Sequence, residues 1–217
     1  MLSYLIRVKW RNGMTSIFEA IKKGIDIANV ISEMTDRGIM LEKTKWNLNG
    51  FKPDNKLLDI GGCGEYIIMN NTECDMIIID NDPDKYINNK RVKTYNMDAQ
   101  SMKFEEESFQ HISLFYTLLY MDNNEIKQTL LECNRVLKKA GHIYCWDIMN
   151  ENVTESLVLA PIRIIGGNSD EECCFASNAV REVRNVEFYK QLITSSGLKI
   201  FQMELNNNGI YLDCIHG

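Results

Sequence analysis

Short, unbroken apolar runs that alternate with helical stretches dominate the middle of this sequence. Residues 76–79 are apolar throughout, as a strand buried on both faces requires, and residues 56–60 read as another short buried strand. Further strands are expected at 92–95, 111–115 and 142–146, with a helix at about 124–137 between the last two. Strands that alternate with helices in this way favour a mostly parallel sheet with helices on both faces. The sequence therefore predicts an α/β fold.

The C-terminal part has a different pattern, which predicts an antiparallel end to the sheet. Asn185 begins a helix as its N-cap, and Gly197 ends it. Residues 198–205 and 210–215 then read as strands. Residues 206–209 separate them and end in Asn-Gly, which tolerates the positive φ angles of a tight hairpin turn. We therefore expect a C-terminal antiparallel hairpin on an otherwise parallel sheet.

The first fifty residues are predicted to form an N-terminal helical cap segment, followed by one domain over residues 51–217. Ser16 and Glu19 form a capping box, and apolar residues from 17 to 31 recur at helical spacing. This helix is interpreted either as a packing element or as a lid over a ligand site. Residues 150–180 show the least regular pattern and are predicted to be an insertion or loop.

Composition and cysteine usage exclude several classes of protein. The net charge of −6 argues against a broad electrostatic contact with nucleic acid. The longest apolar stretch, 156–167, is interrupted by Pro161 and Arg163 and is too short to span a membrane. The seven cysteines follow no metal-ligand spacing, so we expect free thiols, a reducing cytoplasmic location and no metal site.

Two acidic positions mark a candidate binding site. Asp59 opens the stretch Asp-Ile-Gly-Gly-Cys-Gly after the first strand, where glycines allow a sharp turn and close approach of a ligand. Asp80 ends the next strand, 19 residues beyond Gly61, where a carboxylate is able to accept both ribose hydroxyls. A tight turn and a helix cap are the simpler interpretations. A nicotinamide dinucleotide site is disfavoured because its third glycine would fall at Ile67.

Four stretches in order, LLDIGGCGEY, IIIDNDPDKY, MDAQSMKFEEESFQHISLFYTLLYMD and LLECNRVLKKAGHIYCWDI, resemble the motifs of class I S-adenosylmethionine-dependent methyltransferases. The resemblance covers about residues 56–148 and implies a Rossmann-like sheet. It also implies S-adenosyl-L-methionine as cofactor: the first acid and the glycine loop hold its methionine part, the second acid its ribose, and the acid of the Asp-Ala pair its adenine. The implied cofactor-binding residues are Asp59, Gly61, Gly62, Asp80, Asn81, Asp98, Ala99, Phe115 and Tyr116.

Three positions depart from the family pattern. Cys63 and Glu65 stand where the family usually has glycine, and Gln110 replaces an acid before the fourth strand. These departures put cofactor binding in doubt and motivate one alternative, a cofactor-binding partner subunit without catalytic activity.

The expected reaction is methyl transfer to a small-molecule acceptor, for which alignment of the nucleophile is the main requirement. A methyltransferase of protein or nucleic acid is the other alternative. Tyr120 and Asp147, near the carboxyl edge of the sheet, are the candidates for contact with the substrate. His111 and His142 sit at strand starts and are predicted to be structural. The sequence predicts neither the acceptor nor the oligomeric state.

Overall fold

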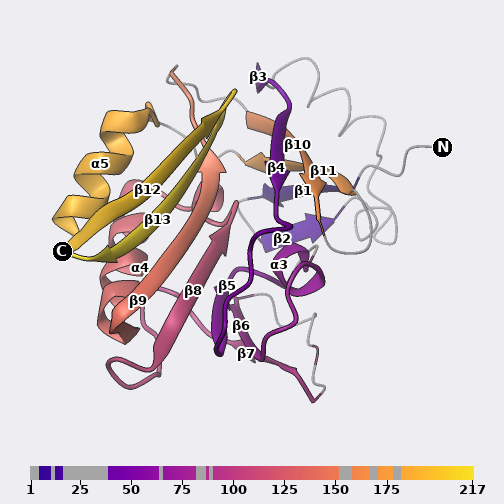
Figure 1. Cartoon of the computed structure of the whole chain (residues 1–217). Coiled ribbons are helices and arrows are strands. Elements are labelled where there is room, and N and C mark those ends of the chain that lie inside the picture. The colour runs from indigo at the N-terminus through magenta and orange to yellow at the C-terminus, as the bar shows by residue number, and fades with distance from the viewer. Residues whose placement is uncertain are drawn as a thin grey trace.

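A computed structural model of the chain describes its fold as two adjoining β-sheets with helices (Figure 1). The residues that the structure describes are 5–10, 13–16, 39–63, 66–81, 87, 90–151, 158–166, 171–177 and 182–217.

The larger sheet contains seven described strands in the order β12-β13-β9-β8-β5-β6-β7. Strands β7, β6, β5, β8 and β9 are parallel to one another, while β13 is antiparallel to β9 and to β12. The predicted Rossmann-like, mostly parallel sheet with a C-terminal antiparallel hairpin is therefore confirmed. The strands are β5 (Leu57–Ile60), β6 (Met76–Asp80), β7 (Val92–Asn96), β8 (Phe109–Phe115), β9 (Leu137–Ile148), β12 (Leu198–Asn206) and β13 (Gly209–His216).

The hairpin turn lies one residue earlier than its Asn-Gly sequence suggested. Asn206 pairs with Gly209, so Asn207 and Asn208 form the two-residue loop. Asn207 has the positive φ, 50°, which asparagine tolerates better than most residues.

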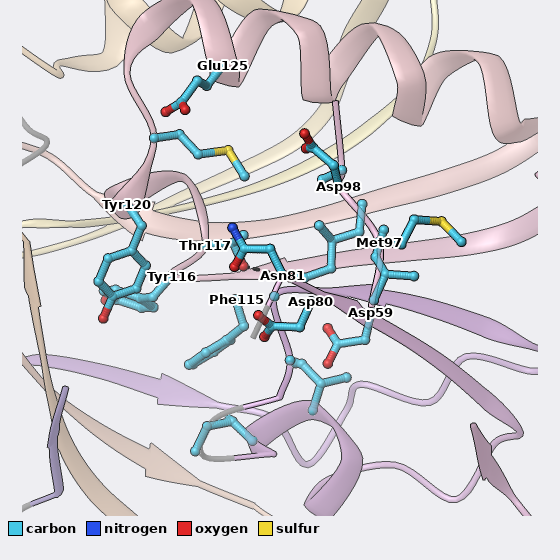
Figure 2. A pocket seen from close by; sticks show the side chains of 18 of the residues that line it. Asp59, Asp80, Asn81, Met97, Asp98, Phe115, Tyr116, Thr117, Tyr120 and Glu125 are labelled. Carbon is cyan, nitrogen blue, oxygen red and sulfur yellow. Dashed lines mark hydrogen bonds between the residues drawn. The ribbon is translucent and has the colours of Figure 1, made fainter. Parts of the chain in front are cut away.

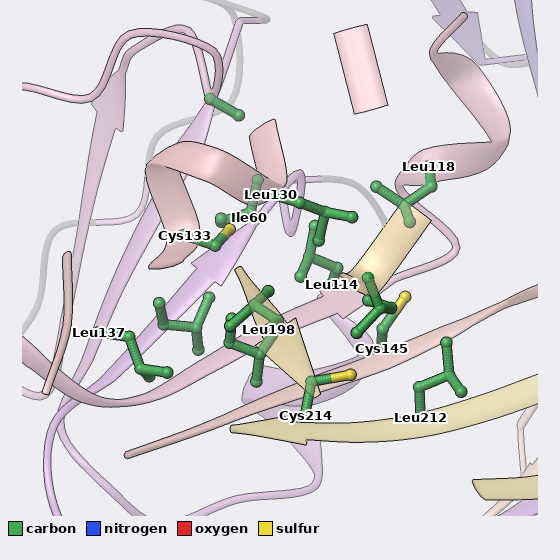
Figure 3. Close-up of a cluster of buried hydrophobic side chains, with 14 of the residues drawn as sticks. Ile60, Leu114, Leu118, Leu130, Cys133, Leu137, Cys145, Leu198, Leu212 and Cys214 are labelled. Atoms are coloured by element: carbon green, nitrogen blue, oxygen red, sulfur yellow. The ribbon is translucent and has the colours of Figure 1, made fainter. Parts of the chain in front are cut away.

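Helices cover both faces of the larger sheet. Helices α4 (Asn123–Val136) and α5 (Val186–Ser195) pack on one face, where apolar side chains of helices and strands form a buried core (Figure 3). The short helix α3 (Ile67–Asn70) and the smaller sheet cover the other face. Asp122 caps α4 through a capping box with Glu125, and Asn185 caps α5 as predicted.

Residues 150–180, predicted to be an irregular insertion or loop, instead contribute two strands of the smaller sheet. The strands are β10 (Val158–Ile165) and β11 (Glu171–Ser177), which pair with each other. Pro161 obscured this pattern because proline interrupts most strands. The carbonyl of Leu159 accepts the N–H of Leu41. Backbone groups two residues apart on a strand face the same side, so the Pro161 nitrogen, which carries no hydrogen, faces the same side of β10. Pro161 lies opposite the gap between β3 and β4, so its lack of an N–H removes no hydrogen bond from the pairing of β10 with these two strands.

Four strands lie in the described part of the first fifty residues, so the predicted helical cap segment is helical at most in part. They are β1 (Leu5–Trp10), β2 (Gly13–Ser16), β3 (Ile39–Met40) and β4 (Thr44–Asn47). β1 pairs with β11, while β3 and β4 pair with β10. The helix expected after Ser16 lies outside the described residues. The division of the chain at residue 50 stays a prediction.

Trp46 on β4 is 2% exposed and packs in the core between the two sheets. All seven cysteines are free thiols. In the described part of the chain, no helix has the length and apolarity to cross a membrane, and no group of three or more acidic, histidine or cysteine side chains is arranged to hold a metal ion.

Candidate functional site

A pocket opens at the carboxyl edge of the larger sheet, above the ends of β5, β6, β7 and β8 (Figure 2). The empty space within it, including solvent at its mouth, is about 880 Å³. This is the place where open α/β sheets bind ligands. The predicted cofactor residues all line it: Asp59, Gly61, Gly62, Asp80, Asn81, Asp98, Ala99, Phe115 and Tyr116, joined by Tyr120 from the substrate-side candidates.

The glycine loop packs too tightly for side chains. The N–H of Gly61 donates to the carbonyl of Ile79 at 2.8 Å, and Gly61 has a φ of 75°. A Cβ on Gly61 would lie 2.7 Å from Thr117 Cγ2, and one on Gly62 only 2.0 Å from Asp59 Oδ2. Because of this packing the backbone of the loop, without side chains, forms the floor of the pocket.

Asp59 lies beneath this loop as a buried carboxyl group with 1% exposure. Burial raises its pKa to about 7, the charge of Asp80 adds to the rise, and a 2.6 Å hydrogen bond from Ser113 Oγ opposes it. An ionised Asp59 is therefore costly unless a cation enters the pocket. The methionine ammonium of the implied cofactor is such a cation.

Asp80 links the end of β6 to the glycine loop. Its Oδ2 accepts the backbone N–H of Cys63 at 3.1 Å. The Cys63 side chain is fully buried and packs against the core on the α3 side, so this departure from the family pattern leaves the pocket lining unchanged. Glu65, the other departure in the loop, lies outside the described residues.

The segment after β7 forms the third acidic wall. Asp98 Oδ1 accepts the N–H of Gln100 at 2.9 Å, which fixes a local turn. Met97, Ala99 and Gln100 line the pocket beside it, and Asn81 enters from the end of β6. Polar acceptors from three neighbouring strands thus meet in one pocket, while their assignments to methionine, ribose and adenine stay predictions.

Aromatic rings form the wall after β8. Tyr116 has a φ of 53°, an uncommon value for a non-glycine residue, and its N–H donates to the carbonyl of Trp146 at 2.7 Å. The Tyr116 ring stacks on Phe175, with centroids 5.0 Å apart and planes at 11°. Trp46 Nε1 donates to the Tyr116 hydroxyl at 3.1 Å, and burial raises the pKa of that hydroxyl. Phe175, from β11, is a pocket residue that the sequence reasoning missed.

Asp147 does not line the pocket, although the sequence suggested contact with substrate. It is fully buried, and its carboxylate accepts the N–H groups of Leu119 at 3.0 Å and Ile148 at 2.7 Å. Burial raises its pKa to about 6, and the nearby charge of Arg184 opposes the rise. Its position on β9 is near the carboxyl edge, but its side chain points into packed protein. We therefore assign it to structure.

Arg184 shares this structural role. Its guanidinium donates to the carbonyls of Leu118 at 2.9 Å and Met121 at 2.6 Å. Arg184 and Asp147 together hold the 3₁₀ turn η1 (Leu118–Tyr120) from behind, and this turn carries Tyr120 into the pocket.

Neither His111 nor His142 lines the pocket. His111 lies within hydrogen-bond distance of Asp54 (2.7 Å) and Tyr144 (3.1 Å), and His142 within 2.8 Å of Asp213. These contacts are consistent with the structural role expected of both histidines.

A glycine loop and acidic strand ends around one pocket at the carboxyl edge of a parallel sheet are the arrangement in which open α/β sheets bind adenosine-type cofactors. A family model described as a methyltransferase domain matches residues 58–145. This part of the chain is therefore similar to a methyltransferase domain, in agreement with the resemblance of its motifs. No curated protein matches the sequence.

Solved structures agree with this fold. An S-adenosylmethionine-dependent methyltransferase from Methanosarcina mazei is 15% identical, with a TM-score of 0.53 over 73% of this chain and 91% of its own. Another, from Clostridium acetobutylicum, is 11% identical, with a TM-score of 0.51 over 93% of this chain and 96% of its own. The glycopeptide N-methyltransferase MtfA is 8% identical, with a TM-score of 0.51 over 75% of this chain and 83% of its own.

Proposed function

We propose that this protein transfers a methyl group from S-adenosyl-L-methionine to a small-molecule acceptor. The observation that carries the proposal is the continuity of the pocket, in which the acidic strand ends and the aromatic wall face one space (Figure 2). One part of the pocket suits a nucleoside with an amino acid chain, and the other suits an apolar acceptor. Their adjacency is what methyl transfer requires, since the reacting atoms must be held in line.

Each cofactor residue has a chemically suitable task. Asp59, beneath the backbone of Gly61 and Gly62, would balance the methionine ammonium. Asp80 would accept hydrogen bonds from the ribose, and Asp98 from the adenine amino group. The cofactor supplies a methyl group on a sulfonium, which is already a good leaving group. The tasks of the chain are therefore to bind, to orient and to exclude water.

A small acceptor is favoured by the enclosure of the aromatic wall. Phe115 is 8% exposed, Tyr116 1% and Phe175 5%, so little of this wall is available to the flat surface of a macromolecule. The net charge of −6 also disfavours nucleic acid as the acceptor. The seven free thiols support a reducing location such as the cytosol.

Calorimetric titration with S-adenosylmethionine and S-adenosylhomocysteine tests the cofactor part of the proposal. Incubation with a metabolite extract, followed by assay of S-adenosylhomocysteine, tests the acceptor part. We expect binding of both nucleosides and product formation that survives removal of macromolecules from the extract. Binding without turnover on any extract would instead favour the partner-subunit alternative. Turnover that is lost when macromolecules are removed would favour a protein or nucleic acid acceptor.

A further inference from the structure

In the part of the chain that the structure describes, the charged side chains that line the pocket are all acidic. Asp59, Asp80, Asp98 and Glu125 line it, and none of the described lining residues is basic. Carboxylates at this density lower the free energy of a cation in the pocket and raise that of an anion. An acceptor that must react as an anion, such as a phenolate or a carboxylate, is therefore disfavoured here.

The aromatic wall offers the other half of a cation site. Phe115 lies 5.2 Å from Tyr116 and 6.3 Å from Phe175 between ring centroids, and Tyr116 stacks on Phe175. Aromatic rings attract cations electrostatically, and quaternary ammonium groups are recognised in this way. The flat, apolar rings also match a flat acceptor. The hydroxyl of Tyr116 is occupied by Trp46, so the ring rather than a polar group is what this residue presents.

The described carboxylates of the lining each have a local task, which limits proton abstraction from an acceptor. Asp59 accepts from Ser113 and Asp80 from Cys63. Asp98 accepts from the N–H of Gln100, and Glu125 from the N–H of Asp122 in the capping box of α4. A general base is needed only when the acceptor atom holds a proton at neutral pH. A nucleophile with a lone pair and no proton suits this arrangement best.

Resting on the proposed function, we propose that the acceptor is a neutral aromatic nitrogen heterocycle of the pyridine type. The ring nitrogen forms the new N–CH₃ bond with its lone pair, the C–S bond breaks, and its electron pair stays on sulfur. The positive charge passes from sulfur to nitrogen, and no proton is transferred. The product is an N-methylated aromatic cation, which the carboxylates and the aromatic wall both stabilise.

Calorimetric titration of 1-methylquinolinium into the protein saturated with S-adenosylhomocysteine tests the cation site without turnover. We expect binding, which weakens roughly tenfold in Phe175→Leu because the substitution removes the ring but keeps an apolar side chain. Phe201→Leu is the matched control, since Phe201 is 64% exposed and contacts His142 outside the pocket. Thermal unfolding checks that both variants are folded, and their affinity for S-adenosylhomocysteine should stay within about twofold of the parent protein.

Quinoline and 2-naphthol, two acceptors of similar size, test the reaction. With S-adenosylmethionine, mass spectrometry should detect 1-methylquinolinium and no methyl ether of 2-naphthol. Formation of the ether in preference to the cation would overturn the proposal, as would failure of 1-methylquinolinium to bind protein that binds S-adenosylhomocysteine. Equal affinity of the cation for Phe175→Leu and Phe201→Leu would also overturn it. Failure to bind S-adenosylhomocysteine at all would overturn the proposed function together with this inference.

Discussion

The buried carboxyl of Asp59 makes cofactor affinity depend on pH in a predictable direction. Its pKa is raised to about 7 by burial, so the apoprotein at pH 5.5 holds Asp59 in the neutral form. Binding of the cofactor ammonium requires the ionised form of Asp59, so the carboxyl must release its proton on binding. We therefore predict that affinity for S-adenosylmethionine rises as the pH is raised from 5.5 to 7.

The size of this effect follows from the ionised fraction. With a pKa of about 7, about 3% of Asp59 is ionised at pH 5.5 and about half at pH 7, so affinity should increase roughly 15-fold between them. The stability of the apoprotein changes with pH in the opposite direction. A carboxyl whose pKa is raised on folding keeps a proton that the unfolded chain releases, so its contribution to stability falls as the pH rises from about 4 to 7.

Calorimetric titration in buffers of different ionisation enthalpy measures both the affinity for the cofactor and the number of protons released on binding. At pH 6, about 0.9 proton should be released for each cofactor bound, because nearly all Asp59 starts protonated. Asp59→Asn is the matched variant, since asparagine still accepts the hydrogen bond from Ser113 and does not titrate. Its affinity should be weak and independent of pH over this range. A parent protein with flat affinity from pH 5.5 to 7 and no proton release would refute the reasoning.

Three substitutions test the remaining cofactor contacts, each by calorimetric titration of a folded variant. Asp80→Ala should weaken S-adenosylmethionine binding by about 10- to 100-fold, because hydrogen bonds to a charged group are lost; unchanged affinity would remove Asp80 from the site. Asp98→Asn should weaken S-adenosylmethionine binding less, about tenfold at most, since the amide oxygen still accepts a hydrogen bond. Gly62→Ala should weaken binding and lower the melting temperature, because its Cβ would meet Asp59 Oδ2 at 2.0 Å. Gly50→Ala, with nothing within 4 Å of its Cβ, should change neither property.

The larger sheet and the position of its pocket were predictable because their signals are local. The apolar runs of β5 and β6 need no knowledge of distant residues, and the acids that end them must meet where parallel strands end together. The spacing of Asp59 and Asp80, together with the family resemblance that adds Asp98, therefore predicted three walls of one pocket. Contact with the cofactor itself stays a prediction.

The smaller sheet was not predictable because its pairing is distant in the sequence. Thr44 pairs with Ile162 and Leu5 with Cys173, and no local pattern reports such partners. Phe175 was missed for the same reason, since only the fold brings β11 to the pocket. The run of apolar residues after Glu172, which became β11, was the one signal available in the sequence. Asp147 was misplaced because sequence position gives the edge of the sheet but not the direction of a buried side chain.

The smaller sheet also sets an order of events during synthesis on the ribosome. Residues 44–47 of β4 emerge early, but their partners in β10 follow 118 residues later, counted from Thr44 to Ile162. At about 5–20 residues per second, translation of that interval takes roughly 6 to 24 seconds. Throughout it, Trp46 lacks the strands that bury it and β4 has an unpaired edge, a state prone to association with other chains. The aromatic wall is thus completed late, when β11 supplies Phe175 to a pocket whose floor in β5 and β6 was translated long before.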